Sequence, residues 1–255
     1  MKEEIERLAQ WIAEAEKVVV FTGAGVSTES GIPDFRSPGG LWSRYDPNDF
    51  YFQRFLNSEE ARERYWQMHS ELYQLLKEAK PNLAHYACVE LYRMGKLSSV
   101  ITQNIDNLHQ AAGLPQERVI ELHGNALKVR CLDCGKEYGR EEIQRRVDGG
   151  EKAPRCERCS GLLKPATISF GQAMPQEEML RAEEEARSCD LFLVVGSSLV
   201  VHPAALMPLY AKEGGARLVI INLTDTPYDE QADLLIRGKA GEVLGEVLEV
   251  LKGLS

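Results

Sequence analysis

Residues 17–37 read KVVVFTGAGVSTESGIPDFRS, and this stretch decides the fold that we expect for the chain. Its first part, Val18 to Phe21, is a short apolar run rich in β-branched residues, which predicts a buried strand. Gly23 and Gly25 follow directly. A buried strand that leads into a glycine-rich loop and a helix start can bind phosphate, because the backbone approaches closely and free N–H groups face the anion. A plain tight turn explains the same glycines equally well.

The loop departs from the usual dinucleotide fingerprint. After Gly23 and Gly25, Thr28 stands where a third glycine is usual. An acidic residue at the end of a second strand, about 20 residues further on, is also missing. The next residues, 32–36, read IPDFR and join apolar, acidic, aromatic and cationic side chains, among them Asp34. A bound ligand would lie beside them, and a simple turn does not explain them.

The amino-acid composition limits the classes of protein to which the chain can belong. The 255 residues are 44% hydrophobic and 27% charged, as in an ordinary soluble globular protein. No apolar run approaches the roughly 18–20 residues that span a bilayer, so we expect no membrane segment. The charged amphipathic stretch MKEEIERLAQWIAEAE at the start does not read as a signal peptide, and we expect a cytoplasmic protein. The net charge of −9 argues against nonspecific nucleic-acid binding but is compatible with a basic peptide as partner.

Strands alternate with helices over both ends of the chain, which predicts an α/β protein with a doubly wound parallel sheet. Further strands are expected over Ser99–Thr102, Val119–Leu122, Lys164–Phe170, Leu191–Val195 and Arg217–Ile221. Helices are expected over residues 59–79, 83–94, 175–187 and 241–251. Residues 38–57 are rich in glycine, proline and aromatics and are interpreted as a long ordered loop. That loop is either a lid beside a ligand site or an aromatic patch that packs a small subdomain.

Polar residues follow the ends of several expected strands, where ligands bind in open α/β sheets. These are Gln103, Asn104, Ile105, Asp106 and Asn107; His123 and Gly124; Gly196, Ser197 and Ser198; and Asn222. Structural alternatives remain open at this point. Asp106 is also suited to cap the following helix, and a lone histidine such as His123 is often structural.

Four cysteines form two C-x-x-C pairs, Cys131 with Cys134 and Cys156 with Cys159, separated by 21 residues. This spacing predicts a closed tetrahedral zinc site, since a redox role does not need two pairs and the cytosol disfavours disulfides. With sulfur at all four positions, the metal has a structural role only.

The zinc segment and the 38–80 region predict a smaller second lobe. We assign residues 1–37, 82–126 and 165–255 to the large domain, and residues 38–81 and 127–164 to the small one. The active site is expected in the cleft between the two lobes.

Five features line up in order along the chain: GAGVSTESGIPDFRS, TQNIDNLH, the HG at 123–124, the paired C-x-x-C motifs, and GSSLVVHPAA. Together they resemble the sirtuins, NAD-dependent protein-lysine deacylases, of the prokaryotic type. The resemblance implies a Rossmann-type NAD domain and a small domain with a zinc ribbon and a helical module. It also implies transfer of an acyl group from lysine to ADP-ribose with release of nicotinamide, so that NAD is consumed.

The resemblance assigns roles residue by residue. Residues that line the phosphate loop or close over the nicotinamide ribose are Gly23, Ala24, Gly25, Ser27, Thr28, Asp34, Phe35 and Arg36. Residues that hold the ribose and the nicotinamide carboxamide are Gln103, Asn104, Ile105 and Asp106. The adenosine half is assigned to Gly196, Ser197, Ser198, Asn222 and Ala240. His123 is the implied general base on a ribose hydroxyl.

An acetyl-lysine peptide is implied to add as a strand between two segments of the chain. These segments match Ile168–Met174 and Leu199–His202, with Ile168, Phe170, Gly171, Leu199 and Val200 as contacts. Gln172 stands where most relatives carry glutamate, which leaves peptide preference open. The Tyr-x-x-Arg pair of desuccinylating members is missing between Ser58 and Lys80, so we expect acetyl to be preferred over succinyl.

Two other classes of function remain as alternatives. The first is an NAD hydrolase or mono-ADP-ribosyltransferase on the same fold. The second is a non-catalytic NAD sensor or zinc-ribbon binding module.

Overall fold

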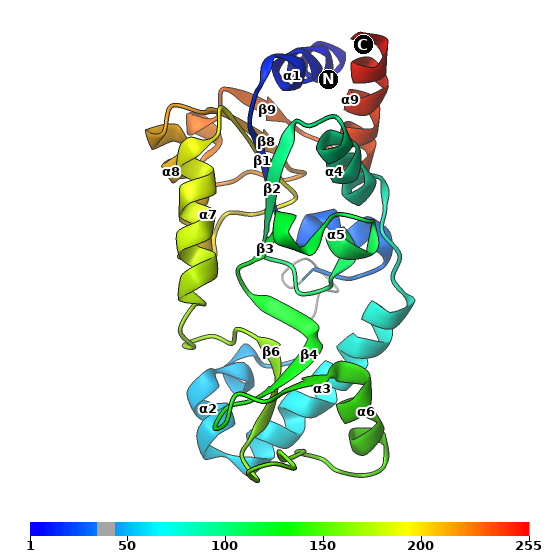
Figure 1. The fold of residues 1–255 in the computed structure, drawn as a ribbon, viewed down its shortest axis with the longest axis vertical. Helices are drawn as coiled ribbons and strands as arrows, with labels where there is room; N and C mark the ends of the chain where they lie inside the picture. Colours follow the sequence, from blue (N-terminus) through cyan, green and yellow to red (C-terminus); the bar gives the residue numbers. More distant parts are fainter. Residues whose placement is uncertain (35–43, 255) are drawn as a thin grey trace.

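The computed structural model describes residues 1–34 and 44–254, which contain two sheets (Figure 1). The large sheet has six strands in the order β3-β2-β1-β7-β8-β9, and all of its pairings are parallel. Its strands are β1 (Val18–Thr22), β2 (Leu97–Thr102), β3 (Val119–Glu121), β7 (Leu191–Val195), β8 (Arg217–Ile221) and β9 (Leu234–Ile236). The expected doubly wound parallel sheet is therefore confirmed.

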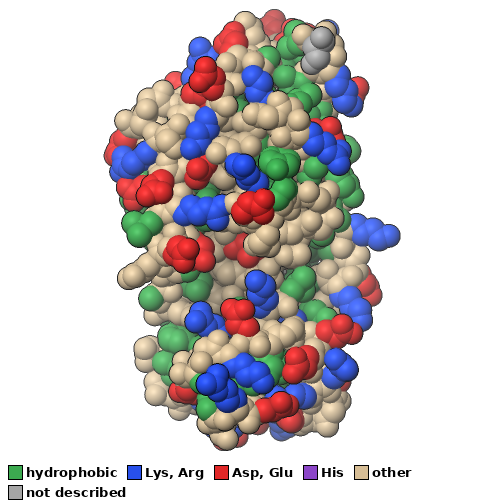
Figure 2. All heavy atoms as spheres, viewed as in Figure 1, with side chains coloured by type: hydrophobic (Ala, Val, Ile, Leu, Met, Phe, Trp, Pro, Cys, Tyr) green, Lys and Arg blue, Asp and Glu red, His purple; other side chains and the backbone are tan. Residues whose placement is uncertain are grey.

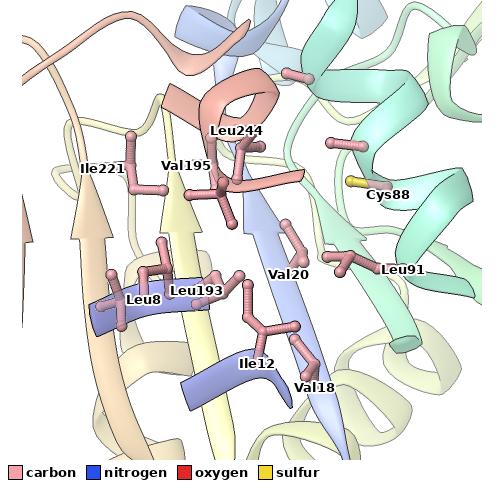
Figure 3. Close-up of a cluster of buried hydrophobic side chains, with 14 of the residues drawn as sticks. Leu8, Ile12, Val18, Val20, Cys88, Leu91, Leu193, Val195, Ile221 and Leu244 are labelled. Carbon is pink, nitrogen blue, oxygen red and sulfur yellow. The ribbon is translucent and has the colours of Figure 1, made fainter. Parts of the chain in front are cut away.

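Helices cover both faces of this sheet, so its strands are mostly apolar. One face packs against α1 (Lys2–Glu14), α4 (Leu83–Arg93) and α9 (Ala240–Leu254), and the other against α7 (Gln176–Ser188) and α8 (Met207–Glu213). Residues of β1 alternate between the two cores. Val18 and Val20 belong to the first (Figure 3), whereas Val19 and Phe21 belong to the second.

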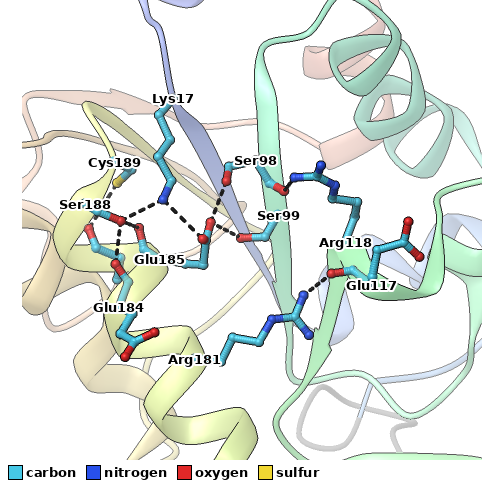
Figure 4. Close-up of polar contacts among 11 residues, drawn as sticks. Lys17, Ser98, Ser99, Glu117, Arg118, Arg181, Glu184, Glu185, Ser188 and Cys189 are labelled. Atoms are coloured by element: carbon cyan, nitrogen blue, oxygen red, sulfur yellow. Dashed lines mark hydrogen bonds and ion pairs between the residues drawn. The ribbon is translucent and has the colours of Figure 1, made fainter.

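Polar contacts also join α7 to the sheet (Figure 4). One oxygen of Glu185 accepts hydrogen bonds from the hydroxyls of Ser98 and Ser99 at 2.6 and 3.0 Å. The other oxygen accepts from Lys17 Nζ at 3.1 Å. A single carboxylate on α7 therefore connects the start of β1 with β2, and these bonds satisfy its half-buried charge.

The smaller lobe contains the three-stranded antiparallel sheet, in the order β5-β4-β6. Its elements are α2 (Phe52–Asn57), α3 (Glu59–Glu78), β4 (Gly124–Cys131), β5 (Glu137–Gly139), α6 (Arg140–Asp148) and β6 (Leu163–Thr167). Trp66 of α3 packs with Val129, Ile143 and Leu163 in the core of this lobe. Because β6 pairs with β4, residues 124–126 and 165–167, which we assigned to the large domain, are part of the small sheet.

The expectation of a loop over residues 38–57 is wrong for its second half. Pro47–Phe50 forms a short 3-10 helix and Phe52–Asn57 forms α2. Asp46 caps the first of these by accepting a hydrogen bond from the Asn48 amide at 3.0 Å, and proline suits the first helical position. Phe50 and Phe55 are buried against Tyr65, which favours the subdomain-packing alternative for these residues.

The helix expected after Asp106 is α5 (Leu108–Ala111), and it begins after Asn107, which adopts a left-handed conformation. Among the helices of the described segments, none is both long and apolar enough to cross a membrane. On the face drawn in Figure 2, acidic and basic side chains are interspersed.

Candidate active site

The site begins where the strand order of the large sheet reverses, between β1 and β7. Chain segments leave such a switch point in opposite directions, which opens a crevice at the carboxyl ends of the strands. The loops after β1 and β7 contact each other, since the amide of Gly25 donates to the carbonyl of Gly196 at 2.8 Å. A cavity of about 580 Å³ lies over them.

The glycines of these two loops allow their close contact. A Cβ on Gly196 would lie 2.5 Å from the nitrogen of Val26, and φ of Gly196 is +62°. A Cβ on Gly23 would lie 2.7 Å from the oxygen of Gly196. Loop–loop packing at the cavity floor therefore explains the glycines, in addition to the close approach to a phosphate that the sequence suggested.

Most of the residues assigned from the sequence line this cavity together. They come from loops far apart in the chain: Gly23, Ala24, Gly25, Thr28, Asp34, Gln103, Asn104, Ile105, His123, Ile168, Phe170, Gly171, Gly196, Ser197, Ser198 and Asn222. Ser27 and Asp106 line a neighbouring cavity of about 30 Å³, which also touches Ala24, Asn104 and Ile105.

Three assigned residues of the described part of the chain are not among those that line either cavity. Leu199 is buried, Val200 is exposed, and Ala240 is buried at the start of α9. Phe35 and Arg36, expected over the nicotinamide ribose, lie outside the described residues.

Buried polar groups at the end of β2 form a network with both loops. Gln103 Nε2 donates to Ser197 Oγ at 2.7 Å, which links β2 to the loop after β7. Asn104 Nδ2 donates to the Gly23 carbonyl at 3.0 Å and to Ser27 Oγ at 3.2 Å. Ser27 Oγ in turn donates to Asp106 at 2.7 Å. Burial raises the pKa of Asp106, although the hydrogen bonds from Ser27 and the Leu108 amide oppose that rise.

Asp106 also accepts from the Leu108 amide at 2.9 Å, so its position at the start of α5 is structural as well as part of the site. Both interpretations of this residue that the sequence left open are compatible with its contacts.

His123 lies between the two lobes, directly before β4. Its Nδ1 is 3.0 Å from the carbonyl oxygen of Gln103, and a carbonyl can only accept, so Nδ1 carries the proton. The remaining nitrogen, Nε2, is therefore an acceptor in the neutral ring. Burial lowers the pKa of His123 below 6.5, partly offset by the Gln103 carbonyl, and the neutral ring predominates at pH 7.

The glycine after this histidine has a steric role. Gly124 has φ +77°, and a Cβ there would lie 2.0 Å from the carbonyl oxygen of Ala166 on β6. Only glycine allows β4 to start this close to β6. The HG pair thus sets the position of the ring relative to the small sheet.

The four cysteines of the paired motifs gather in the small lobe, with their sulfur atoms all within 4.8 Å of one another. Cys131 and Cys159 sulfurs are 3.5 Å apart, and those of Cys134 and Cys156 are 3.7 Å apart. These distances exclude disulfides, which need about 2.05 Å. They match the edge of about 3.8 Å that a tetrahedron with 2.3 Å Zn–S bonds requires. Tyr138 is placed 3.1 Å from Cys156, where its hydroxyl can donate to the thiolate.

Comparison with known proteins agrees with this geometry. The Sir2 family model matches residues 23–203, which contain both switch-point loops, His123 and the four cysteines. The chain belongs to the Sir2 family. It is 54% identical over 241 residues to "NAD-dependent protein deacetylase 1" of Bradyrhizobium diazoefficiens, covering 94% of each protein. The sirtuin resemblance read from the motifs is therefore confirmed.

Solved structures of Sir2 enzymes match along the whole chain. One, described as "Structural Basis for the Mechanism and Regulation of Sir2 Enzymes", has a TM-score of 0.90 at 46% identity and covers 100% of both chains. Another, described as "Sir2-p53 peptide-NAD+", has a TM-score of 0.89 at 38% identity and covers 98% of this chain and 99% of that one.

The sequence motifs do not reveal one part of the Sir2 cavity, its end in the small lobe. This end is lined by Phe50, Tyr65, Met68, His69 and Leu72. Four of them lie on α3 at intervals of three, four and seven residues from Tyr65, a spacing that also describes an ordinary core-facing stripe. The aromatic Phe50 belongs to the segment interpreted as a loop. Only the packing of α3 over the cavity shows that these residues line the cavity and are not simply part of a core-facing stripe.

Proposed function

We infer that this Sir2-family chain is an NAD-dependent protein-lysine deacetylase, which transfers the acetyl group to ADP-ribose and releases nicotinamide. The observation that carries this inference is His123, with a neutral ring and an acceptor Nε2, beside a cavity shared by the switch-point loops and the small lobe. The names of curated relatives and the NAD+ and peptide in a matching structure support it.

The residues present fit NAD. The loops after β1 and β7 offer backbone groups at close range, and Asn104, Asp106 and Ser27 add buried polar groups beside the small cavity. When bound, NAD supplies the C1′ carbon that the acyl oxygen attacks as nicotinamide leaves. We propose that Thr28, Gln103, Ser197, Ser198 and Asn222 hold its ribose and phosphate groups.

His123 then has a defined task. Its Nε2 accepts the proton of a ribose hydroxyl, which lets that oxygen attack the acyl carbon. The Nδ1–H bond to the Gln103 carbonyl fixes the tautomer and stabilises the ring once it becomes positively charged. The same bond joins the ring to the strand end that contacts Ser197.

The acetyl-lysine peptide is proposed to lie along Ile168–Met174 and Leu199–His202. Residues Ile168, Phe170, Gly171, Val201 and His202 line the cavity, which supports this route. Pairing of backbone with backbone gives affinity with limited sequence selectivity.

Acetyl is proposed to be preferred over succinyl. Among the described residues that line the cavity there is no arginine or lysine, and Met68 stands three residues after Tyr65. A buried succinyl carboxylate would therefore have no direct cationic partner, which is costly.

A cytoplasmic location is proposed from the cysteines. All six are free thiols, four of them arranged for zinc, as a reducing compartment favours. Fractionation of cells expressing the chain tests this. We also propose that nucleic acid is not a specific partner, as the net charge of −9 supports.

Mass spectrometry of an acetyl-lysine peptide incubated with the protein, with and without NAD, tests the function. We expect NAD-dependent loss of acetyl together with nicotinamide and O-acetyl-ADP-ribose. Free ADP-ribose with an unchanged peptide would instead indicate an NAD hydrolase, and an ADP-ribosylated protein would indicate the transferase alternative.

A further inference from the structure

Glu121, the last residue of β3, lies two positions before His123, and the reaction above gives it no role. Its side chain is half-buried, and within the described residues the hydrogen bonds of its carboxylate come from neutral amides and not from a cation. Burial raises the pKa of Glu121 and the charge of Asp106 raises it further, although the amides and the charge of Lys128 oppose that rise. A carboxylate placed at such a cost beside a reaction site indicates a role in that site.

One oxygen of this carboxylate joins three elements of the chain. Oε1 accepts a hydrogen bond from Gln110 Nε2 on α5 at 2.8 Å, and another from Asn125 Nδ2 on β4 at 2.8 Å. β4 is the strand that leads from the end of β3 into the small lobe (Figure 1). Glu121 therefore ties α5 and the end of β3 to the start of β4, at the place where the two lobes meet.

The start of β4 in turn holds the loop after β2. Asn125 Nδ2 also donates to Asn107 Oδ1 at 3.1 Å. One residue further along β4, the amide of Ala126 donates to the carbonyl of Ile105 at 2.9 Å. The loop is thus fixed on both sides of Asp106, by a backbone contact before it and by the asparagine pair after it.

Asn107 makes the loop sensitive to this support. Its φ is +64°, a left-handed conformation that costs energy for residues other than glycine and that asparagine adopts when its side chain is hydrogen-bonded locally. Ile105 and Asp106 directly precede it, and both line the small cavity. The sirtuin resemblance assigns the nicotinamide carboxamide to these two residues. A change in the Asn107 turn would therefore move the groups that face nicotinamide.

We propose that Glu121 is a positioning residue for the nicotinamide half of NAD. Acting through Asn125 and Asn107, its carboxylate fixes the loop that contains Asp106. This rests on the proposed deacetylase function and adds a residue that lines neither cavity. The ADP-ribose half of NAD has its proposed partners mainly on the loops after β1, β7 and β8, so the effect of Glu121 is confined to the nicotinamide half.

Two ligands report on the two halves separately. Nicotinamide is a product, and its inhibition constant in the NAD-dependent deacetylation assay reports on the carboxamide pocket. ADP-ribose lacks nicotinamide, and its Kd from calorimetric titration reports on the other loops. In Glu121→Ala we expect the nicotinamide inhibition constant to rise about tenfold, the effect of roughly one hydrogen bond, while the Kd of ADP-ribose stays within about twofold of the wild-type value.

Further variants assign the effect to the hydrogen bonds of Glu121. Glu121→Gln keeps an oxygen that can accept from both amides, so its nicotinamide inhibition constant should return to within about threefold of wild type. Asn125→Ala removes the next link and should reproduce Glu121→Ala, and the double variant should add little to either change. The matched control is Glu117→Ala, an exposed glutamate shortly before β3, which should leave both constants unchanged.

The outcomes separate this role from a merely structural one. If Glu121→Ala weakens nicotinamide and ADP-ribose equally, or changes neither, the positioning role is wrong and the deacetylase function stands. The same holds if Glu121→Gln does not restore nicotinamide inhibition. If Glu121→Ala does not fold, Asn125→Ala decides, since unchanged inhibition there also contradicts the role. If the wild-type protein removes no acetyl group in the presence of NAD, the proposed function fails and this inference fails with it.

Discussion

At His123, two effects act on one ring in opposite directions. Burial lowers its pKa, and the hydrogen bond to the Gln103 carbonyl raises it, with burial the larger effect. The result is a base that is deprotonated at neutral pH and only weakly basic. Since the carbonyl fixes the proton on Nδ1, the same contact that moderates the pKa also decides which nitrogen acts.

The pH dependence of kcat/KM follows from the lowered pKa of His123. The rate needs neutral His123, so it should be constant above the lowered pKa and fall about tenfold per pH unit below it. We expect the acid limb of the profile to have its midpoint below 6.5, measured between pH 5 and 8 with acetyl-lysine peptide. A midpoint at or above 6.5 would contradict the burial argument.

Replacing His123 by alanine should abolish measurable deacetylation. We expect kcat/KM to fall by about 10²–10⁴-fold, the usual contribution of a general base. Binding of NAD should largely survive, because the hydrogen bond of the His123 ring goes to the Gln103 carbonyl and not to a switch-point loop. Product analysis and calorimetric titration with NAD measure the two effects separately. If the variant fails to fold, as its thermal melt would show, the histidine is structural instead.

Among the elements, the loops after β1 and β7 pack so closely that a side chain larger than glycine does not fit at their contact. Gly196→Ala would add both left-handed strain and a contact at 2.5 Å with the Val26 backbone. Gly95→Ala is the matched control, because its φ is +72° but nothing lies within 4 Å of the added Cβ. We expect Gly95→Ala to lose about 1 kcal/mol of unfolding free energy, and Gly196→Ala to lose about 1–3 kcal/mol more.

Urea unfolding measures both losses, and NAD titration should show weaker binding only for Gly196→Ala. If both variants lose the same unfolding free energy, the contact between the two loops adds nothing to the cost of placing alanine in a left-handed conformation.

Sequence patterns located the elements well where local signals and burial agree. Leu191–Val195 and Arg217–Ile221 were placed to the residue, because continuous apolar runs describe strands covered on both faces. The pattern was misleading over residues 47–57, where Gly, Pro and aromatic residues upstream suggested a loop and the capping by Asp46 was overlooked. The partner of β6 could not be known, since pairing with β4 is a tertiary choice.

At the scale of the whole molecule, the sequence could not show which residues tertiary packing brings to the site. Motifs identified the NAD-facing loops, His123 and the cysteines, since each has distinctive chemistry at a fixed spacing. His69 and Leu72 were not identified, because residues at helical spacing look alike whether they face a core or a cavity. Their role depends on α3, which contacts both lobes: Trp66 packs with the zinc module, while Leu72 packs with Ile32 and Leu108.

Zinc removal should therefore affect the small lobe more than the sheet. Cys131 and Cys156 belong to the same cluster as Trp66, so a chelator should loosen the packing of α3, change Trp66 fluorescence and abolish activity. The secondary structure of the large sheet should persist in circular dichroism. Loss of all structure in one step, or full activity without zinc, would contradict this.

Cysteine variants provide the control for that experiment. Cys134→Ser should lower the zinc content, which is expected to be one ion per chain, whereas Cys88→Ala should retain it. Cys88 is buried in α4, away from the sulfur cluster.

The position of β1 in the sheet has a consequence for synthesis on the ribosome. Val18 pairs with Leu97 on one side and with Leu191 on the other, 173 residues later in the chain. At 5–20 residues per second, roughly 9–35 s pass between the synthesis of these two partners. During that interval one edge of β1, which is apolar from Val18 to Phe21, is open at the centre of the future sheet. The nascent chain is thus most in need of a chaperone before β7 emerges, and slower translation between β2 and β7 would lengthen that exposure.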